Sequence, residues 1–215
     1  MDIQLWSDVV CPWCYLGRRR LAAAVAQYDG EVTVTFRAFQ LDASPVPPGL
    51  PIKAAMAAKF GDRERVDQML AHVTALAAEE GLRLDYDRAI AANTFDSHRL
   101  IAWAARQGRQ AEMVEALQRA HFLEGLDVGS RAVLASVAGS LGLNPAAAIA
   151  YLESEAGTSA VEADLTEARE LNITSVPFFL VDGKYALQGA QEASTLVTAF
   201  EEIARRETVD ILRFT

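Results

Sequence analysis

Residues 7–17 of the chain read Ser-Asp-Val-Val-Cys-Pro-Trp-Cys-Tyr-Leu-Gly, and this stretch decides the fold. Residues 2–7 before it alternate polar and apolar side chains, which is typical of a strand. Pro12 suits the first turn of a helix, because its missing N–H would be unpaired there in any case. Residues 31–41 alternate again over a β-branched and aromatic run. The sequence therefore predicts a β-α-β unit with the two cysteines at the turn from strand to helix.

Strand patterning returns near the other end of the chain. Residues 177–182, Pro-Phe-Phe-Leu-Val-Asp, have strand character, and Asp182-Gly183 is a strong hairpin signal that makes 184–188 the returning strand. Residues 192–206 have the apolar spacing of an amphipathic helix. The chain therefore closes with a β-β-α unit.

The segment between these two units is predicted to be helical. It begins with a proline-rich stretch at 44–51, and 29 of the 39 alanines lie between residues 41 and 172. Alanine is the best helix former, so we expect helices almost throughout. They are placed near 62–80, 95–107, 110–123, 131–141, 145–154 and 160–171. The predicted start signals are Ser130, Asn144-Pro145, and Ser159 with Glu162 as a capping box.

This order predicts an α/β fold with an insertion. Neither terminal unit has enough strands for a stable sheet alone, so the two are expected to share one sheet. We expect one domain from residues 1–41 and 173–215. An all-helical domain is inserted at 42–172, with the proline-rich linker at its start.

Charge and hydropathy exclude several classes of protein. The formal net charge of −9 argues against a general nucleic-acid binder, which needs a basic face to displace counterions from phosphate. No run of about 20 apolar residues exists to span a membrane. The N-terminus lacks the charged and apolar regions of a secretory signal, so we expect a cytoplasmic protein.

Cys11 and Cys14 are the only cysteines. The Cys-x-x-Cys spacing at a helix start is a strong redox signal. Free backbone N–H groups and the helix dipole stabilise a thiolate at Cys11, whereas Cys14 lies one turn deeper and is expected to be more buried. Cys11 would form a mixed disulfide with a substrate, and Cys14 would resolve it.

Two plainer interpretations of the cysteine pair are weaker. Packing alone would be served equally well by small apolar residues. A closed zinc site needs four ligands, and the nitrogen donors His72, His98 and His121 are scattered through the helical segment. No metal site is therefore predicted.

Pro177 stands directly before the third predicted strand. Only about 5–6% of X-Pro bonds in folded proteins are cis, so the Val176-Pro177 dipeptide by itself favours trans.

The combined motifs resemble a known family. The stretch Ser7-Asp-Val-Val-Cys-Pro-Trp-Cys-Tyr-Leu-Gly, together with Asn93-Thr-Phe-Asp-Ser-His-Arg-Leu and Val176-Pro-Phe-Phe, is similar to the DsbA-like branch of the thioredoxin fold. More narrowly, it resembles the FrnE-like cytosolic oxidoreductases. The resemblance covers essentially the whole chain. It implies that Pro177 is cis and lies against the cysteines, and that Val176 offers its backbone to an extended substrate.

Further site residues follow from this resemblance. Asn93 and His98 would line the cleft that faces the cysteine pair, and His98 would tune or shuttle protons to a thiolate. Trp13 is expected to be an exposed aromatic on the substrate-facing surface.

We expect a thiol–disulfide oxidoreductase that cycles Cys11 and Cys14 between dithiol and disulfide. Its partners would be protein or small-molecule thiols and disulfides, with glutathione as a possible co-substrate and no other cofactor. An alternative comes from the same superfamily. It is a glutathione-dependent isomerase or kappa-like glutathione transferase that acts on a small aromatic molecule in a deep pocket.

Overall fold

The computed structural model describes the backbone of residues 1–213 and the side chains of residues 1–208. Within this part of the chain a single sheet forms from β1 (Asp2–Ser7), β2 (Thr33–Ala38), β3 (Phe178–Val181) and β4 (Tyr185–Gln188). Its strand order is β2-β1-β3-β4. β1 pairs with β2 in parallel and with β3 antiparallel, and β3 and β4 form the hairpin. The two terminal units therefore share one sheet, as predicted.

The alternation along β1 divides the sheet into two apolar faces. Ile3 and Leu5 are fully buried on the face that carries the large core cluster, where Leu21 and Phe200 belong to the two covering helices. Trp6 points to the other face, into a smaller cluster that contains both cysteines. Burying each such side chain contributes about 1.5–3 kcal/mol. The cysteine pair is thus attached to a well-packed sheet.

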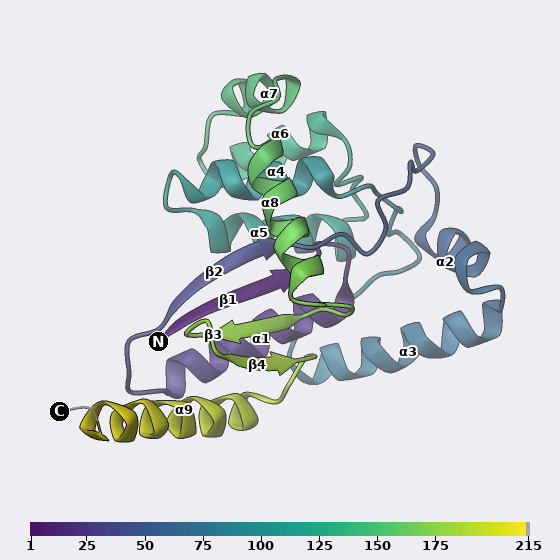
Figure 1. The fold of residues 1–215 in the computed structure, drawn as a ribbon. Helices are drawn as coiled ribbons and strands as arrows, with labels where there is room; N and C mark the ends of the chain where they lie inside the picture. The colour runs from purple at the N-terminus through teal and green to yellow at the C-terminus, as the bar shows by residue number, and fades with distance from the viewer. Residues whose placement is uncertain (214–215) are drawn as a thin grey trace.

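Helices surround the sheet in three groups (Figure 1). α1 and α9 pack together against the sheet. α2 and α3 extend past the end of α1, and α4 to α8 gather beside β2. Their bounds are α1 (Pro12–Gln27), α2 (Ile52–Phe60), α3 (Arg63–Glu79), α4 (Phe95–Ala105), α5 (Gln110–Phe122), α6 (Arg131–Ser140), α7 (Pro145–Glu153), α8 (Thr158–Glu170) and α9 (Ala193–Arg213).

The predicted helices are found within a few residues, with two corrections. Sequence analysis placed no separate helix at 52–60, where α2 begins directly after Pro51. The predicted capping box at Ser159 is wrong, because α8 begins at 158 behind Gly157, whose φ of 78° suits glycine. Asn144 does cap α7, and its side chain accepts from the N–H groups of residues 146 and 147.

Side chains from the helical segment cover the open edge of β2. The Gln110 amide donates to Phe36 O and accepts from Phe36 N, at 2.9 and 3.1 Å. Asp164 Oδ2 accepts from Ala38 N at 2.8 Å. These contacts replace a missing neighbouring strand, and they fix α5 and α8 against the sheet.

Among the helices that the structure describes, none has the length and apolar character that crossing a bilayer requires.

Candidate active site

Cys11 and Cys14 lie at the start of α1, with Cys11 as the N-cap residue and Pro12 in the first turn. Cys14 N–H donates to Cys11 O at 3.1 Å, which closes the first turn and brings the two side chains to one end of the helix. Both are free thiols, and they are 3% and 0% exposed. The prediction that Cys14 is the more buried is confirmed by a small margin.

The two thiols have different surroundings. Burial is the largest cause that raises the pKa of Cys14 well above its usual value, followed by its hydrogen bond and charge interaction with Cys11. Cys11 has no turn of helix in front of it, and its thiol donates to Val176 O, with Sγ 3.9 Å from the oxygen. The two thiols are therefore unequal, and burial favours the protonated form of Cys14.

The peptide bond between Val176 and Pro177 is cis, as the resemblance implied. Pro177 packs directly on α1 at Gly17. A Cβ added at Gly17 would lie 2.7 Å from Pro177 Cγ, closer than real side chains approach. Only glycine at position 17 leaves room for Pro177 to pack this closely on α1. This packing also holds Val176 O beside the Cys11 sulfur.

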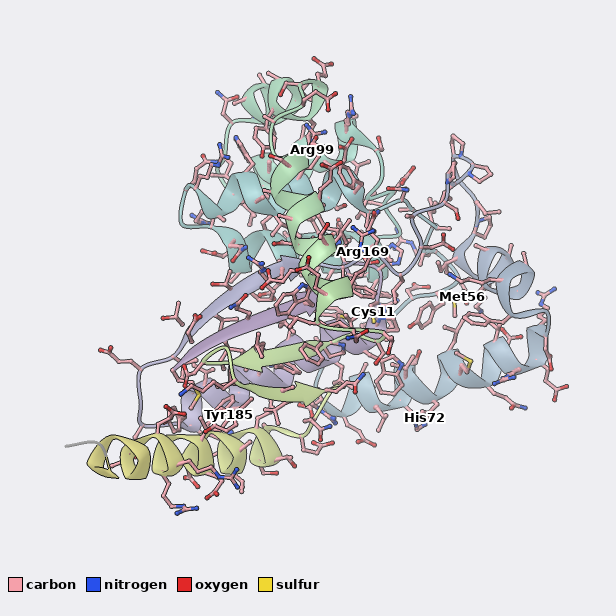
Figure 2. All side chains as sticks on the ribbon, viewed as in Figure 1. Cys11, Met56, His72, Arg99, Arg169 and Tyr185 are labelled. Atoms are coloured by element: carbon pink, nitrogen blue, oxygen red, sulfur yellow. The ribbon has the colours of Figure 1, made fainter. Side chains whose placement is uncertain are left out.

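Trp13 stands at the rim of the site and is 36% exposed, as expected, and its contact with a substrate stays a prediction. Its ring lies 6.0 Å from that of His72 on α3. Figure 2 shows Cys11 at the end of the sheet, with Met56 and His72 on the α2–α3 side of it. The rim beside the cysteines is thus partly built by the first helices of the inserted segment.

His98 and Asn93 come from the beginning of α4 and occupy different positions. His98 is 5% exposed, and its Nε2–H donates to Phe39 O at 3.0 Å and lies 3.5 Å from Asp8 Oδ1. Asn93 uses both ends of its amide for other protein groups, including the Ala43 carbonyl and the Phe95 N–H at 3.0 Å each. Asn93 therefore anchors the 40–44 segment. Its substrate binding stays a prediction.

Two of the three arginines that follow the cysteines are largely buried and bind neighbouring elements. Arg20 is 6% exposed and binds Glu80, Glu192 and the Ala190 carbonyl. The Arg18 side chain is 12% exposed and bonds to Gln118 on α5. Arg18 and Arg20 therefore connect α1 to segments that are distant in the sequence, and the sequence does not predict these contacts.

Sequence analysis missed two groups near the site. Tyr86 is buried, and both its burial and the nearby Cys11 sulfur raise its pKa. Burial lowers the pKa of His121 to about 4, and the Asp8 charge acts against that shift. Neither residue stands in a motif, so only the fold reveals where they lie.

The alternative function predicts a deep pocket beside the cysteines. A cavity of about 210 Å³ lies beside β2, lined among others by Arg37, His98, Ile101 and Asp164, and neither cysteine lines it. Larger cavities of about 480 and 590 Å³ are also without either cysteine in their linings. Among the described residues, no group of three or more acidic, histidine or cysteine side chains is arranged to hold a metal ion.

A paired-cysteine helix start that faces a cis-proline on a sheet of this order defines a protein of the thioredoxin fold. Residues 2–201 match the DSBA-like thioredoxin domain family, and the chain belongs to this family. No curated protein matches the chain in sequence.

Solved structures show the same fold across nearly the whole chain. A probable DsbA oxidoreductase from Streptomyces coelicolor is 33% identical, with a TM-score of 0.87 over 94% of this chain and 89% of that one. The cytosolic disulfide reductase DsbM from Pseudomonas aeruginosa, solved with GSH, is 21% identical, with a TM-score of 0.68 over 95% and 100%. A 2-hydroxychromene-2-carboxylate isomerase is 19% identical, with a TM-score of 0.72 over 97% and 98%. At such identities the last two show the fold alone.

Proposed function

We propose that this protein is a thiol–disulfide oxidoreductase that exchanges disulfides through Cys11 and Cys14. The observation that carries the proposal is the asymmetry of the pair at the start of α1: Cys11 is the N-cap residue and lies beside Val176 O, and Cys14 is fully buried behind it. Membership of the DSBA-like family supports the same class of chemistry.

The cycle begins with the Cys11 thiolate, whose charge the N-terminal amide groups of α1 stabilise. It attacks one sulfur of a substrate disulfide, forms a mixed disulfide and releases the other substrate sulfur as a thiolate. Cys14 loses its proton and attacks Cys11 Sγ. The Cys11–Cys14 bond then forms, and the second substrate sulfur leaves. Two electrons pass from the cysteine pair to the substrate, and the reverse sequence oxidises a dithiol.

Substrate and compartment are extensions of this proposal. Val176 offers its carbonyl beside Cys11 and Trp13 offers an exposed ring, so we propose that an extended segment of a protein or a small thiol docks between them. The DsbM relative was solved with GSH and is cytosolic. On that similarity, we propose glutathione as a co-substrate and the cytoplasm as the location, as in the FrnE-like proteins that the motifs resemble.

Reduction of insulin disulfides tests the proposed function. Replacing Cys11→Ser should lower the catalysed rate at least about a hundredfold, because no other thiol can start the cycle. Replacing Cys14→Ser should also stop turnover, but it should leave a mixed disulfide on Cys11 that mass spectrometry detects. Catalysis that survives in the Cys11→Ser variant would refute the proposal.

A further inference from the structure

Arg20 is a buried cation on α1, the helix that begins with the cysteine pair. It is 6% exposed, and all three nitrogens of its guanidinium bind protein groups. Nε donates to Glu80 Oε1 at 2.9 Å, Nη1 donates to Ala190 O at 2.8 Å, and Nη2 lies 2.6 Å from Glu192 Oε1. Because the burial of a charge is costly, the contacts of Arg20 indicate what it holds in place.

The two carboxylates that bind Arg20 are open to water. The side chains of Glu80 and Glu192 are 28% and 60% exposed, and ion pairs that water reaches contribute little to stability. Glu80 follows the last residue of α3 and orients the guanidinium from that side. The third contact differs, because Ala190 O belongs to the backbone of residues 189–192, which we call the β4–α9 connection. Arg20 thus attaches this connection to α1.

The β4–α9 connection lies between Arg20 and the proline of the site. Gly189 N–H donates to Pro177 O at 2.8 Å, and the next residue accepts from Arg20. The connection also packs on α1, because a Cβ added at Gly17 would lie 3.5 Å from Ala190 Cα. Pro177 is therefore held to α1 twice, by its direct packing on Gly17 and by the hydrogen bonds that run through Gly189 and Ala190.

The strand end before this connection binds the residue that precedes Val176. The Gln188 side chain donates to the Ser175 hydroxyl. Val176 thus stands between two residues, Ser175 and Pro177, that are both hydrogen-bonded to residues 188–189. Its own carbonyl accepts from the Cys11 thiol. A displacement of residues 188–190 would therefore move Val176 O relative to the Cys11 sulfur.

We propose that Arg20 is a positioning residue for the cysteine site. Its guanidinium holds the β4–α9 connection against α1, and the connection keeps the Val176 backbone where an extended substrate docks beside Cys11. This inference rests on the proposed function and deepens it. Arg20 takes no part in the bond changes, because it acts only through the backbone that it holds. Its loss should therefore slow the reaction with an extended polypeptide more than the reaction with a small disulfide that has no backbone to dock.

Two other roles for Arg20 predict different results. A positive charge that acts on the cysteines would change the rate with every disulfide, and Arg20→Lys would preserve that rate. A role in stability alone would lower the free energy of unfolding and leave the rates of the folded protein unchanged. A positioning role changes the rate with extended substrates, and lysine does not replace arginine, because one ammonium group cannot bind three partners that lie in different directions.

Two disulfide probes separate these roles. Insulin, reduced with dithiothreitol as the electron donor, presents its disulfides on an extended chain, whereas 4,4′-dithiodipyridine is a small aromatic disulfide. In Arg20→Lys and Arg20→Met we expect kcat/KM for insulin to fall at least about fivefold, because a small displacement of a docking group is costly for the rate. The rate with 4,4′-dithiodipyridine should change less than about twofold. Arg20→Lys provides the test if Arg20→Met does not fold.

Arg18→Lys and Arg18→Met are the matched controls. Arg18 also stands on α1 and its side chain is 12% exposed, but its hydrogen bonds run to Gln118 and Glu115 on α5. These variants should leave the rates with both probes unchanged.

Hydrogen exchange at Gly189 measures the position of the β4–α9 connection without any activity. In Arg20→Met, exchange of the Gly189 N–H should become at least about tenfold faster relative to the amides of β1, because the connection opens locally. A general loss of stability would instead accelerate both sets of amides together. Arg18→Met should leave the ratio unchanged.

Four results would overturn the positioning role of Arg20. These are an unchanged insulin rate in Arg20→Lys, an equal loss of rate with both probes, an equal loss with insulin in the Arg18 variants, and unchanged exchange at Gly189 in Arg20→Met. An unsubstituted protein that reacts with neither probe would instead refute the proposed cysteine cycle.

Discussion

At the scale of single residues, the geometry of the site depends on Gly17, which has no side chain to separate α1 from Pro177. Gly17→Ala places a Cβ 2.7 Å from Pro177 Cγ, so α1 and the Val176–Pro177 segment must move apart. We expect a loss of about 1–3 kcal/mol of unfolding free energy. We also expect a slower reaction of Cys11 with a disulfide, because Val176 O moves away from the sulfur. Urea unfolding and stopped-flow thiol exchange measure the two effects.

Gly139→Ala is the matched control for Gly17→Ala. Its added Cβ would lie 2.9 Å from Pro145 Cγ, a similar clash between a helix and a proline, but within the α6–α7 pair. It should lower stability and leave thiol exchange unchanged. Equal exchange rates in both variants would show that the approach of Pro177 to Gly17 does not set the geometry of the site.

Individual site residues were predictable only where they stand in a motif. Cys11, Cys14 and Pro177 could be identified because their spacing or their place before a strand carries the signal. Tyr86 and His121 approach the site from segments remote in sequence, and a single sequence contains no information on that proximity.

At the scale of elements, the Asn93–Leu100 motif connects α4 to its neighbours. Arg99, labelled in Figure 2, is 3% exposed, binds Asp96, and donates to four carbonyls at residues 151–156 that end α7. Arg99→Lys keeps the charge but loses the planar fork. We expect a loss of about 1–3 kcal/mol in urea unfolding, because buried carbonyls lose their donors.

Arg131→Lys provides the comparison for Arg99→Lys. Arg131 pairs with the same Asp96 at 2.7 Å, but its side chain is 49% exposed, so its loss should cost less than about 1 kcal/mol. A cost in Arg131→Lys as large as that in Arg99→Lys would mean that Asp96, and not the α7 carbonyls, is the partner that matters.

The spacing of apolar residues predicted most helices and strands, because in these elements the apolar positions are the buried ones. Five of the six placed helices begin within about one residue of the observed start. α8 begins two residues early, because a left-handed Gly157 and not a serine cap precedes it. α2 has no fully buried residue and therefore little apolar periodicity, which explains why no separate helix was placed there.

At the scale of the whole molecule, one apolar core joins the sheet to the helical segment. The large cluster runs from Ile3 and Phe179 in the sheet to Leu117 and Leu152 in the helices. Sequence predicted the insertion, because each terminal unit is too small alone. It did not predict that the inserted helices would complete the core of the sheet, although the family resemblance placed Asn93 and His98 of the inserted segment beside the cysteines. The domain boundaries at 41 and 173 stay a prediction.

Because His121 is buried in the folded protein, the free energy of unfolding of the whole molecule depends on pH. Burial lowers its pKa in the folded protein to about 4, whereas a histidine in the unfolded chain titrates near about 6.5. As the pH falls from 6.5 towards 4, the unfolded chain binds a proton that the folded chain does not. The free energy of unfolding therefore decreases in this window, by up to about 1.4 kcal/mol per pH unit and roughly 2–3 kcal/mol in all.

Replacing His121→Leu should remove this part of the pH dependence. At pH 7 the substitution should be nearly neutral, because neither ring nitrogen has a partner to lose among the described residues. Urea unfolding of both proteins between pH 4.5 and 7.5 measures the difference, and carboxylates common to both cancel. Substitution of the exposed His72 by glutamine is the control and should leave the slope unchanged. Parallel curves for the native and His121→Leu proteins would mean that His121 takes up its proton in the folded state, with Asp8 close enough to stabilise it.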